Sequence, residues 1–186
     1  MCGRYSLYQE DNDEIREILE RTEGDVKTGE IFPTDKALVL IRRQNDICPE
    51  AVKWGFPGFR NKGLIINARA ETIQEKTMFR KCLPSGRCII PSTGFFEWSH
   101  DKNKQKYLFN LPGTGALYMA GLFNNYSGET NFVIITTDAN ESMADIHNRM
   151  PVVLNKDELT LWLGSLEQSL NILKEKRPML LKQLYG

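Results

Sequence analysis

The chain has 186 residues, of which 41% are hydrophobic and 26% charged, an ordinary balance for a globular domain that buries a sizeable core without disulfide bonds. Its 24 basic and 24 acidic side chains cancel, which excludes nucleic-acid binding through bulk charge, so any phosphate-binding surface has to come from local clustering. The sequence contains neither a signal-peptide pattern nor an apolar run long enough to span a membrane, and we therefore expect a cytoplasmic protein.

The N-terminal half is expected to alternate short strands with helices. MCGRYSLY alternates like a strand, and residues 11–21 form an amphipathic pattern whose capping box pairs Asp11 with Glu14. ALVLIRR and ICPEAVKWGF flank a turn at residues 44–46 and predict a hairpin, in which Pro49 disturbs the second strand. After a glycine-rich loop and the apolar run LII, residues 72–83 predict a second helix.

From residue 87 onwards the pattern is dominated by strands. RCIIP, GFFEWSH, QKYLFNL, ALYMAGLF and FVIITTD are separated by DKNK, PGTG and NNYSGET, which are rich in turn residues. Short helices are predicted around ANESMADI and in NKDELTLWLG. We predict one α+β domain over residues 1–186, a mainly antiparallel curled sheet or barrel with peripheral helices.

The cysteines do not indicate a metal site. They form no CxxC pair and have no histidine partner at zinc spacing. We interpret Cys48, Cys82 and Cys88 as reduced structural thiols, and we expect no metal and no other cofactor.

Cys2 is different because it follows the initiator methionine. Removal of Met1 would give Cys2 a free α-amine beside its thiol, a 1,2-aminothiol that no internal cysteine can form. The alternative is a small apolar residue at the start of an edge strand, and position alone favours this alternative.

Glu97 and His147 are candidates for proton transfer. Glu97 stands between two aromatic residues, and burial there would raise the pKa of its carboxyl group. The alternative is a strand glutamate that points to solvent. His147 lies between a predicted helix and a strand, where it is either a proton shuttle or a structural histidine.

Three arginines each lie two residues after another candidate residue. Arg4 follows Cys2, Arg69 follows Asn67 and Arg149 follows His147 at this spacing, which puts each pair on one face of an extended segment. Together the three guanidinium groups would suit a phosphate or a carboxylate.

Six ordered strings extend these observations: MCGRY, IFPTD, KWGF, INARAET, RCIIPSTGFFEW and IHNRMPVVL. In this order and spacing they resemble the SOS response-associated peptidase (SRAP) family, whose members recognise abasic sites in DNA. The resemblance runs from Cys2 to about Leu154.

The resemblance implies a role for each candidate residue. Cys2, exposed by removal of Met1, would form a thiazolidine with the ring-opened abasic site in single-stranded DNA. Glu97 would be the main acid and base, His147 would assist at the sugar and in any β-elimination, and Asn67 would hold the nucleophile. The implied DNA contacts are Arg4, Pro33, Trp54, Arg69 and Arg149.

Trp54 is implied to be a wedge that stacks on a base, although without the resemblance we would place it in the core. The chain departs from the family where Glu30 and Asp35 stand in a loop expected to face DNA, which puts that contact in doubt. We keep Pro33 as a contact there.

The expected partner is single-stranded DNA that contains abasic sites, bound by a monomer in the nucleoid and without a membrane. Two other classes of function remain open. The same Cys2, Glu97 and His147 could form an N-terminal-nucleophile peptidase that removes its own leader, or the chain could be a DNA-binding domain without catalysis.

Overall fold

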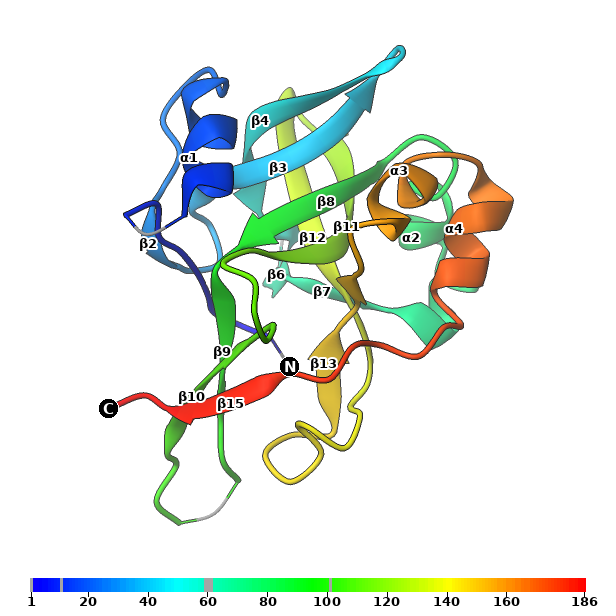
Figure 1. Cartoon of the computed structure of the whole chain (residues 1–186). Coiled ribbons are helices and arrows are strands. Elements are labelled where there is room, and N and C mark those ends of the chain that lie inside the picture. The colour runs from blue at the N-terminus through cyan, green and yellow to red at the C-terminus, as the bar shows by residue number, and fades with distance from the viewer. Residues whose placement is uncertain (1, 11, 59–61, 101) are drawn as a thin grey trace.

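The computed structural model describes residues 2–10, 12–58, 62–100 and 102–186 (Figure 1). Its strands are β1 (Tyr5–Leu7), β2 (Gly29–Ile31), β3 (Lys36–Arg43), β4 (Asp46–Trp54), β5 (Phe56–Pro57), β6 (Leu64–Ile65), β7 (Asn67–Arg69), β8 (Arg87–Ser92), β9 (Gly94–Trp98), β10 (Lys106–Asn110), β11 (Leu117–Tyr126), β12 (Glu129–Asp138), β13 (Arg149–Pro151), β14 (Val153–Leu154) and β15 (Leu181–Leu184). Its helices are α1 (Asp13–Glu20), the 3-10 helix η2 (Ala70–Thr72), α2 (Thr77–Arg80), α3 (Glu158–Trp162) and α4 (Leu166–Ile172).

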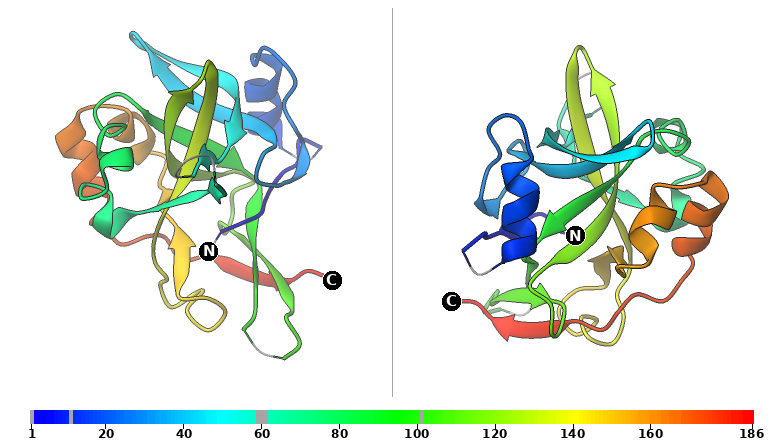
Figure 2. Two further views of the ribbon diagram at one scale, coloured as in Figure 1. Left: turned by 180° about the vertical axis from the view of Figure 1, so that it is seen from behind. Right: turned by 45° about the horizontal axis from the view of Figure 1, so that its top comes forward.

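The larger sheet closes on itself. Within the described residues β12, β4, β3, β8 and β11 pair in this order, and β11 pairs back with β12, so these strands form a closed barrel. The β12–β4 pairing is parallel, whereas the other pairings of the ring are antiparallel. The helices α1 and α3–α4 lie on different sides of the barrel (Figures 1 and 2). This arrangement confirms the predicted strand-dominated α+β fold.

A second sheet carries the N-terminus. Its strand order is β15-β10-β9-β1-β2, and all its pairings are antiparallel. In Figure 1 the strands β9, β10 and β15 project below the barrel, and the start of the chain passes beside them. The C-terminal strand β15, which the sequence pattern did not predict, therefore lies close to the N-terminal segment.

Among the described residues, the buried apolar side chains other than Phe96 form one cluster. Its largest members include Trp54, Trp162, Tyr5 and Phe56, each with an exposed fraction of 0%. None of the helices in the described part of the chain is long and apolar enough to cross a membrane.

Several local predictions need correction. The cap of α1 is Asn12, whose side chain accepts a hydrogen bond from the backbone N–H of Ile15 at 3.0 Å, while the predicted cap, Asp11, lies outside the described residues. The strand β4 continues through Pro49, because on the edge away from β3 it pairs with β12 only at Lys53 and Trp54 and with Glu23 only at Glu50, so Pro49 lies outside the paired positions of that edge.

Two predicted helices are shorter or missing. Residues 72–83 contain only the end of η2 and the short α2, since intrinsic propensity is too weak to maintain a helix against tertiary packing. The segment around ANESMADI forms turns. There the Oδ1 of Asn140 accepts a hydrogen bond from the backbone N–H of Ser142, a local bond that competes with helical hydrogen bonding.

Candidate active site

Cys2 is held between the two sheets by Asn67. The Nδ2 of Asn67 donates a hydrogen bond to the carbonyl oxygen of Cys2 at 3.1 Å. Asn67 is fixed in turn by the parallel pairing of β7 with β12, where it lies opposite Ile134. The exposed fraction of Cys2 is 1%, and its thiol lies 3.9 Å from the carbonyl oxygen of Arg4. Residues 65 positions apart are thus joined directly at the N-terminal segment.

Glu97 lies on the inner side of β9. Its exposed fraction is 7%, so the alternative of a solvent-facing glutamate is wrong. Burial raises the pKa of the Glu97 carboxyl group. Burial also raises the pKa of the Cys2 thiol, and the charge of Glu97 raises it further, which requires the two side chains to be close. The structure therefore brings Cys2, Asn67 and Glu97 together.

His147 has a defined hydrogen-bonding arrangement. Its Nδ1 accepts a hydrogen bond from the backbone N–H of Arg149 at 2.9 Å, so the neutral ring carries its proton on Nε2. Burial lowers the pKa of His147, which favours this neutral form. The ring centroid of His147 is 5.0 Å from that of His100, which follows the end of β9. The sequence offered no signal that the two histidines would meet.

Arg149 and Arg69 differ in accessibility. The side chain of Arg149 is 8% exposed, and its guanidinium binds Glu71 at 2.8 Å and Asp138 at 2.6 Å. It also donates to the carbonyl oxygen of Thr136 at 2.8 Å. Arg69 is exposed on β7. The expected phosphate contact of Arg149 thus finds no support in its surroundings, whereas Arg69 is accessible.

Trp54 is a core residue. Its exposed fraction is 0%, and its Nε1 donates to the carbonyl oxygen of Ile66 at 3.1 Å. Its ring packs against Tyr5 and Phe132, with centroids 5.3 and 6.1 Å away. No face of the ring is open to a base, so the expected role of Trp54 as a wedge is not supported by this placement.

Pro33 lies half-buried in a tight turn after β2. The Oδ2 of Asp35 accepts a hydrogen bond from the backbone N–H of Phe32 at 2.9 Å, and Thr34 has a φ of 82°. Asp35 therefore caps the turn that presents Pro33. Phe32, which the sequence interpretation did not single out, is 40% exposed beside it.

Arg4 belongs to the same surface. Its guanidinium forms an ion pair with Glu30 at 3.2 Å. Glu30, discounted as a DNA contact because of its charge, thus faces one of the arginines expected to bind phosphate.

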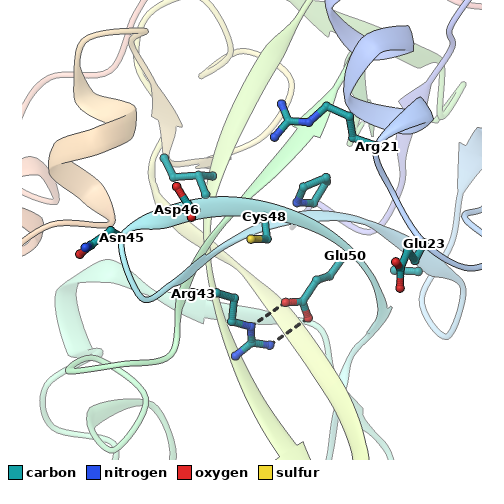
Figure 3. Close-up of a pocket in the computed structure, with 10 residues that line it drawn as sticks. Arg21, Glu23, Arg43, Asn45, Asp46, Cys48 and Glu50 are labelled. Carbon is teal, nitrogen blue, oxygen red and sulfur yellow. Dashed lines mark hydrogen bonds and ion pairs between the residues drawn. The ribbon is translucent and has the colours of Figure 1, made fainter.

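A groove of about 1060 Å³ lies beside the hairpin of β3 and β4, and none of the predicted site residues lines it (Figure 3). Its wall contains the ion pair of Arg43 and Glu50, with distances of 2.6 and 2.9 Å. This groove is separate from the site around Cys2.

The model of the family described as SOS response associated peptidase (SRAP) matches residues 1–183. The chain belongs to this family. The resemblance found in the sequence motifs is therefore confirmed, over a range that includes Cys2, Asn67, Glu97 and His147.

Named relatives support the assignment to the SRAP family. "Abasic site processing protein YoaM" of Bacillus subtilis is 34% identical over 181 residues, which cover 88% of this chain and 79% of that protein. "Abasic site processing protein YedK" of Escherichia coli is 30% identical over 176 residues and covers the same shares, 88% and 79%. A crystal structure of a protein from Bacteroides thetaiotaomicron has a TM-score of 0.74 at 26% identity, covering 92% of this chain and 86% of that chain.

Proposed function

We propose that this SRAP-family protein captures abasic sites in single-stranded DNA through the α-amine and the thiol of Cys2 after removal of Met1. The observation that carries the proposal is the contact of Asn67 with Cys2 beside the buried carboxyl group of Glu97. The names of the relatives, which are abasic site processing proteins, support the same substrate.

The proposed reaction has three steps. The neutral α-amine attacks the aldehyde carbon of the ring-opened sugar and forms a carbinolamine. Loss of one water gives an imine, and the thiol then adds across the C=N bond and closes a five-membered thiazolidine. The thiol gives up its proton and the ring nitrogen carries one hydrogen, so the net reaction of aldehyde and aminothiol gives the thiazolidine and one water.

The protonation states of the Cys2 amine and thiol favour a first attack by the amine. Burial raises the pKa of the thiol, so a thiolate is scarce near neutral pH. An α-amine has an ordinary pKa of about 7.7–8.0, and roughly a tenth or more of it is neutral at physiological pH. The amine is therefore the initial nucleophile, and the thiol reacts only once the imine has formed.

Glu97 and His147 supply the proton transfers in this proposal. The raised pKa of Glu97 lets it donate a proton to the departing hydroxyl group and accept the thiol proton afterwards. The Nε2–H of neutral His147 can donate a hydrogen bond to the sugar oxygen during ring opening. To accept a proton in a β-elimination that cuts the strand, its Nδ1 would have to release the backbone N–H of Arg149. This AP-lyase activity is a more specific proposal than covalent capture of the abasic site.

Asn67 is proposed to position the reacting residue. Its Nδ2 already binds the carbonyl oxygen of Cys2. Within the described residues its Oδ1 is buried and has no hydrogen-bond partner, so it can accept a hydrogen bond from the attacking amine or from a sugar hydroxyl. The amide would thus bind both the protein and the substrate during attack.

The raised pKa of the Cys2 thiol also bears on the peptidase alternative. A cysteine that attacks an amide does so as a thiolate, and such cysteines lie in electropositive surroundings that lower the thiol pKa. The neighbour of Cys2 is the carboxyl group of Glu97, which acts in the opposite direction. These surroundings favour capture of an aldehyde by the aminothiol over hydrolysis of a peptide.

The proposal is tested with a single-stranded oligonucleotide that carries one abasic site. Intact mass establishes whether Met1 is absent, and a denaturing gel after heating detects the persistent adduct. We expect the wild type to form it and Cys2→Ala to form only an imine that borohydride traps. Cys48→Ala, which changes a half-exposed cysteine in the separate groove, is the matched control and should react normally.

Retention of Met1 in protein that forms the adduct would refute the aminothiol mechanism. A persistent adduct of Cys2→Ala without borohydride would refute the thiazolidine step alone. Cleavage of a peptide without reaction on abasic DNA would instead favour the hydrolase.

A further inference from the structure

The outer face of the five-stranded sheet carries a cluster that the proposed chemistry does not use. Side chains alternate along β9, so Phe96 and Trp98 lie on the side opposite Glu97. Lys106 lies directly opposite Trp98 in the β9–β10 pairing and shares this outer face. We call Arg4, Glu30 and Lys106 the Glu30 cluster.

Glu30 binds both cations of the cluster. One carboxylate oxygen lies 3.2 Å from a guanidinium nitrogen of Arg4, and the other lies 2.6 Å from the Nζ of Lys106. The side-chain exposures of Arg4, Glu30 and Lys106 are 29%, 24% and 18%. The cluster is therefore partly shielded but open to solvent, and it carries a net charge of one cation.

Aromatic rings hold both cations in place. The guanidinium of Arg4 lies 4.2 Å from the ring centroid of Phe32 and 4.9 Å from that of Trp98. The ammonium of Lys106 lies 4.0 Å from the ring centroid of Phe96. These cation–π contacts fix the two charges, so an anion meets a preformed site.

The C-terminal segment completes the surroundings of Lys106. The backbone N–H of Tyr185 donates to the carbonyl oxygen of Lys106 at 2.8 Å, and its ring centroid lies 4.6 Å from the Lys106 ammonium. The Tyr185 ring also packs edge-on against Phe96, with centroids 4.9 Å apart. This explains why β15, which is exposed along its length, pairs with β10.

We propose that Arg4 and Lys106 form a binding site for a phosphodiester of single-stranded DNA, and that Glu30 is the internal counter-ion which the phosphate displaces. A carboxylate and a phosphate present similar oxygen pairs to a guanidinium, so the Glu30 carboxylate marks where phosphate oxygens bind. The site rests on the proposed function because it is where the strand around a captured abasic site would lie.

The position of the cluster fits this role. Arg4 is two residues from Cys2, and its carbonyl oxygen lies 3.9 Å from the Cys2 thiol and accepts a hydrogen bond from the backbone N–H of Phe96 at 2.9 Å. The Arg4 backbone therefore connects Cys2 to the cluster, which lies on the face of the sheet opposite Glu97. The proposal requires the DNA strand to continue from Cys2 onto that outer face. Since Glu30 must leave its two cations before the phosphate binds them, it lowers the affinity for DNA.

The test is the affinity for an undamaged, fluorescently labelled oligothymidylate, measured by anisotropy at several salt concentrations. Glu30→Gln should bind about two- to thirty-fold more tightly, the size expected from loss of two partly exposed ion pairs. Lys106→Gln should weaken binding and reduce the slope of log affinity against log salt by about 0.7, the value for one phosphate contact on a single strand. In the double variant, part of the gain from Glu30→Gln should be lost.

Glu50→Gln is the matched control, because Glu50 pairs with Arg43 at 2.6 Å in the separate groove (Figure 3) and removal of its charge should not change the affinity by the same factor. An equal gain in Glu50→Gln would mean that net charge alone is responsible, and would overturn the proposal. So would unchanged or weaker binding by Glu30→Gln with an unaltered melting temperature. If Glu30→Gln is unstable, the salt slope of Lys106→Gln decides.

These outcomes are separable from failure of the proposed function. If the wild type forms the abasic adduct but neither Glu30→Gln nor Lys106→Gln changes the affinity for oligothymidylate, only the phosphate site is refuted. A wild type that binds oligothymidylate through the cluster but forms no adduct would refute only the covalent capture.

Discussion

Similar residues are enclosed in the buried interior of the site but partly exposed on the outer face of the five-stranded sheet. In the interior, the ring of Trp54 packs against Tyr5 and Phe132 and the guanidinium of Arg149 binds Glu71 and Asp138, with exposed fractions of 0% and 7% for Trp54 and Arg149. On the outer face, Phe32 is 40% exposed and the Arg4 side chain is 29% exposed. The comparison teaches that an aromatic or an arginine is available to DNA only where the fold leaves its polar or π surface partly open.

Trp54→Ala should have the largest effect on stability. It removes a fully buried ring from contact with Tyr5 and Phe132, and such truncations cost about 3–5 kcal/mol. Phe32→Ala, at an exposed aromatic, should cost less than about 1 kcal/mol. Urea unfolding measures both. Equal losses of stability in the two variants would contradict the distinction between the buried interior and the outer face.

Glu97→Gln should slow formation of the abasic adduct by about 100-fold or more, the usual contribution of a positioned acid or base. Binding of undamaged oligothymidylate should change little, since Glu97 lies on the inner side of β9. Rapid-quench assays at saturating abasic DNA measure the rate. Equal losses in rate and affinity would mean that Glu97 is structural.

We also expect the stability of Glu97→Gln to depend on pH differently from that of the wild type. Burial raises the pKa of Glu97 above its ordinary value of 4.5, so the folded chain holds this proton more tightly than the unfolded chain does. The stability that comes from this proton is fully present below the ordinary pKa and is lost as pH rises through the raised one. Melting curves should therefore show Glu97→Gln gaining stability relative to the wild type as pH rises above the ordinary pKa of 4.5, until the raised pKa is passed.

Arg149→Gln should destabilise the fold by about 2 kcal/mol, the order expected for charged hydrogen bonds to buried groups such as the Thr136 carbonyl. Its ion pairs with Glu71 and Asp138 are lost at the same time. The salt slope of DNA binding should stay as in the wild type. A slope reduced by about 0.7 in a folded variant would show that Arg149 leaves its carboxylates to bind phosphate.

Arg4→Gln should have the smallest effect on stability, under about 1 kcal/mol, because its ion pair with Glu30 is partly exposed. Its effect should appear in DNA affinity and salt slope instead. Chemical denaturation combined with anisotropy separates the two quantities. A large loss of stability without a change in DNA affinity would show that Arg4 has a structural role, like Trp54 and Arg149.

Much of the fold could be predicted because it depends on local pattern. Alternation located the hairpin of β3 and β4 and the run of strands from β8 to β12, and turn residues separated them. The predicted helix around ANESMADI was wrong because Asn140 forms a side-chain hydrogen bond to Ser142. The strand β15 was missed because its side chains are all exposed, so it has no buried face to produce an alternating pattern.

The sequence by itself determined the family, the candidate aminothiol at Cys2 and the set of polar residues gathered around it, since these are matters of residue type and order. Only the tertiary structure decided the surroundings of each side chain. It placed Asn67 against Cys2 and Glu97 out of solvent, it enclosed Trp54 and Arg149, and it paired Glu30 with Arg4 and Lys106. Burial, pKa and ion pairing depend on contacts between segments far apart in the chain, which no local pattern encodes.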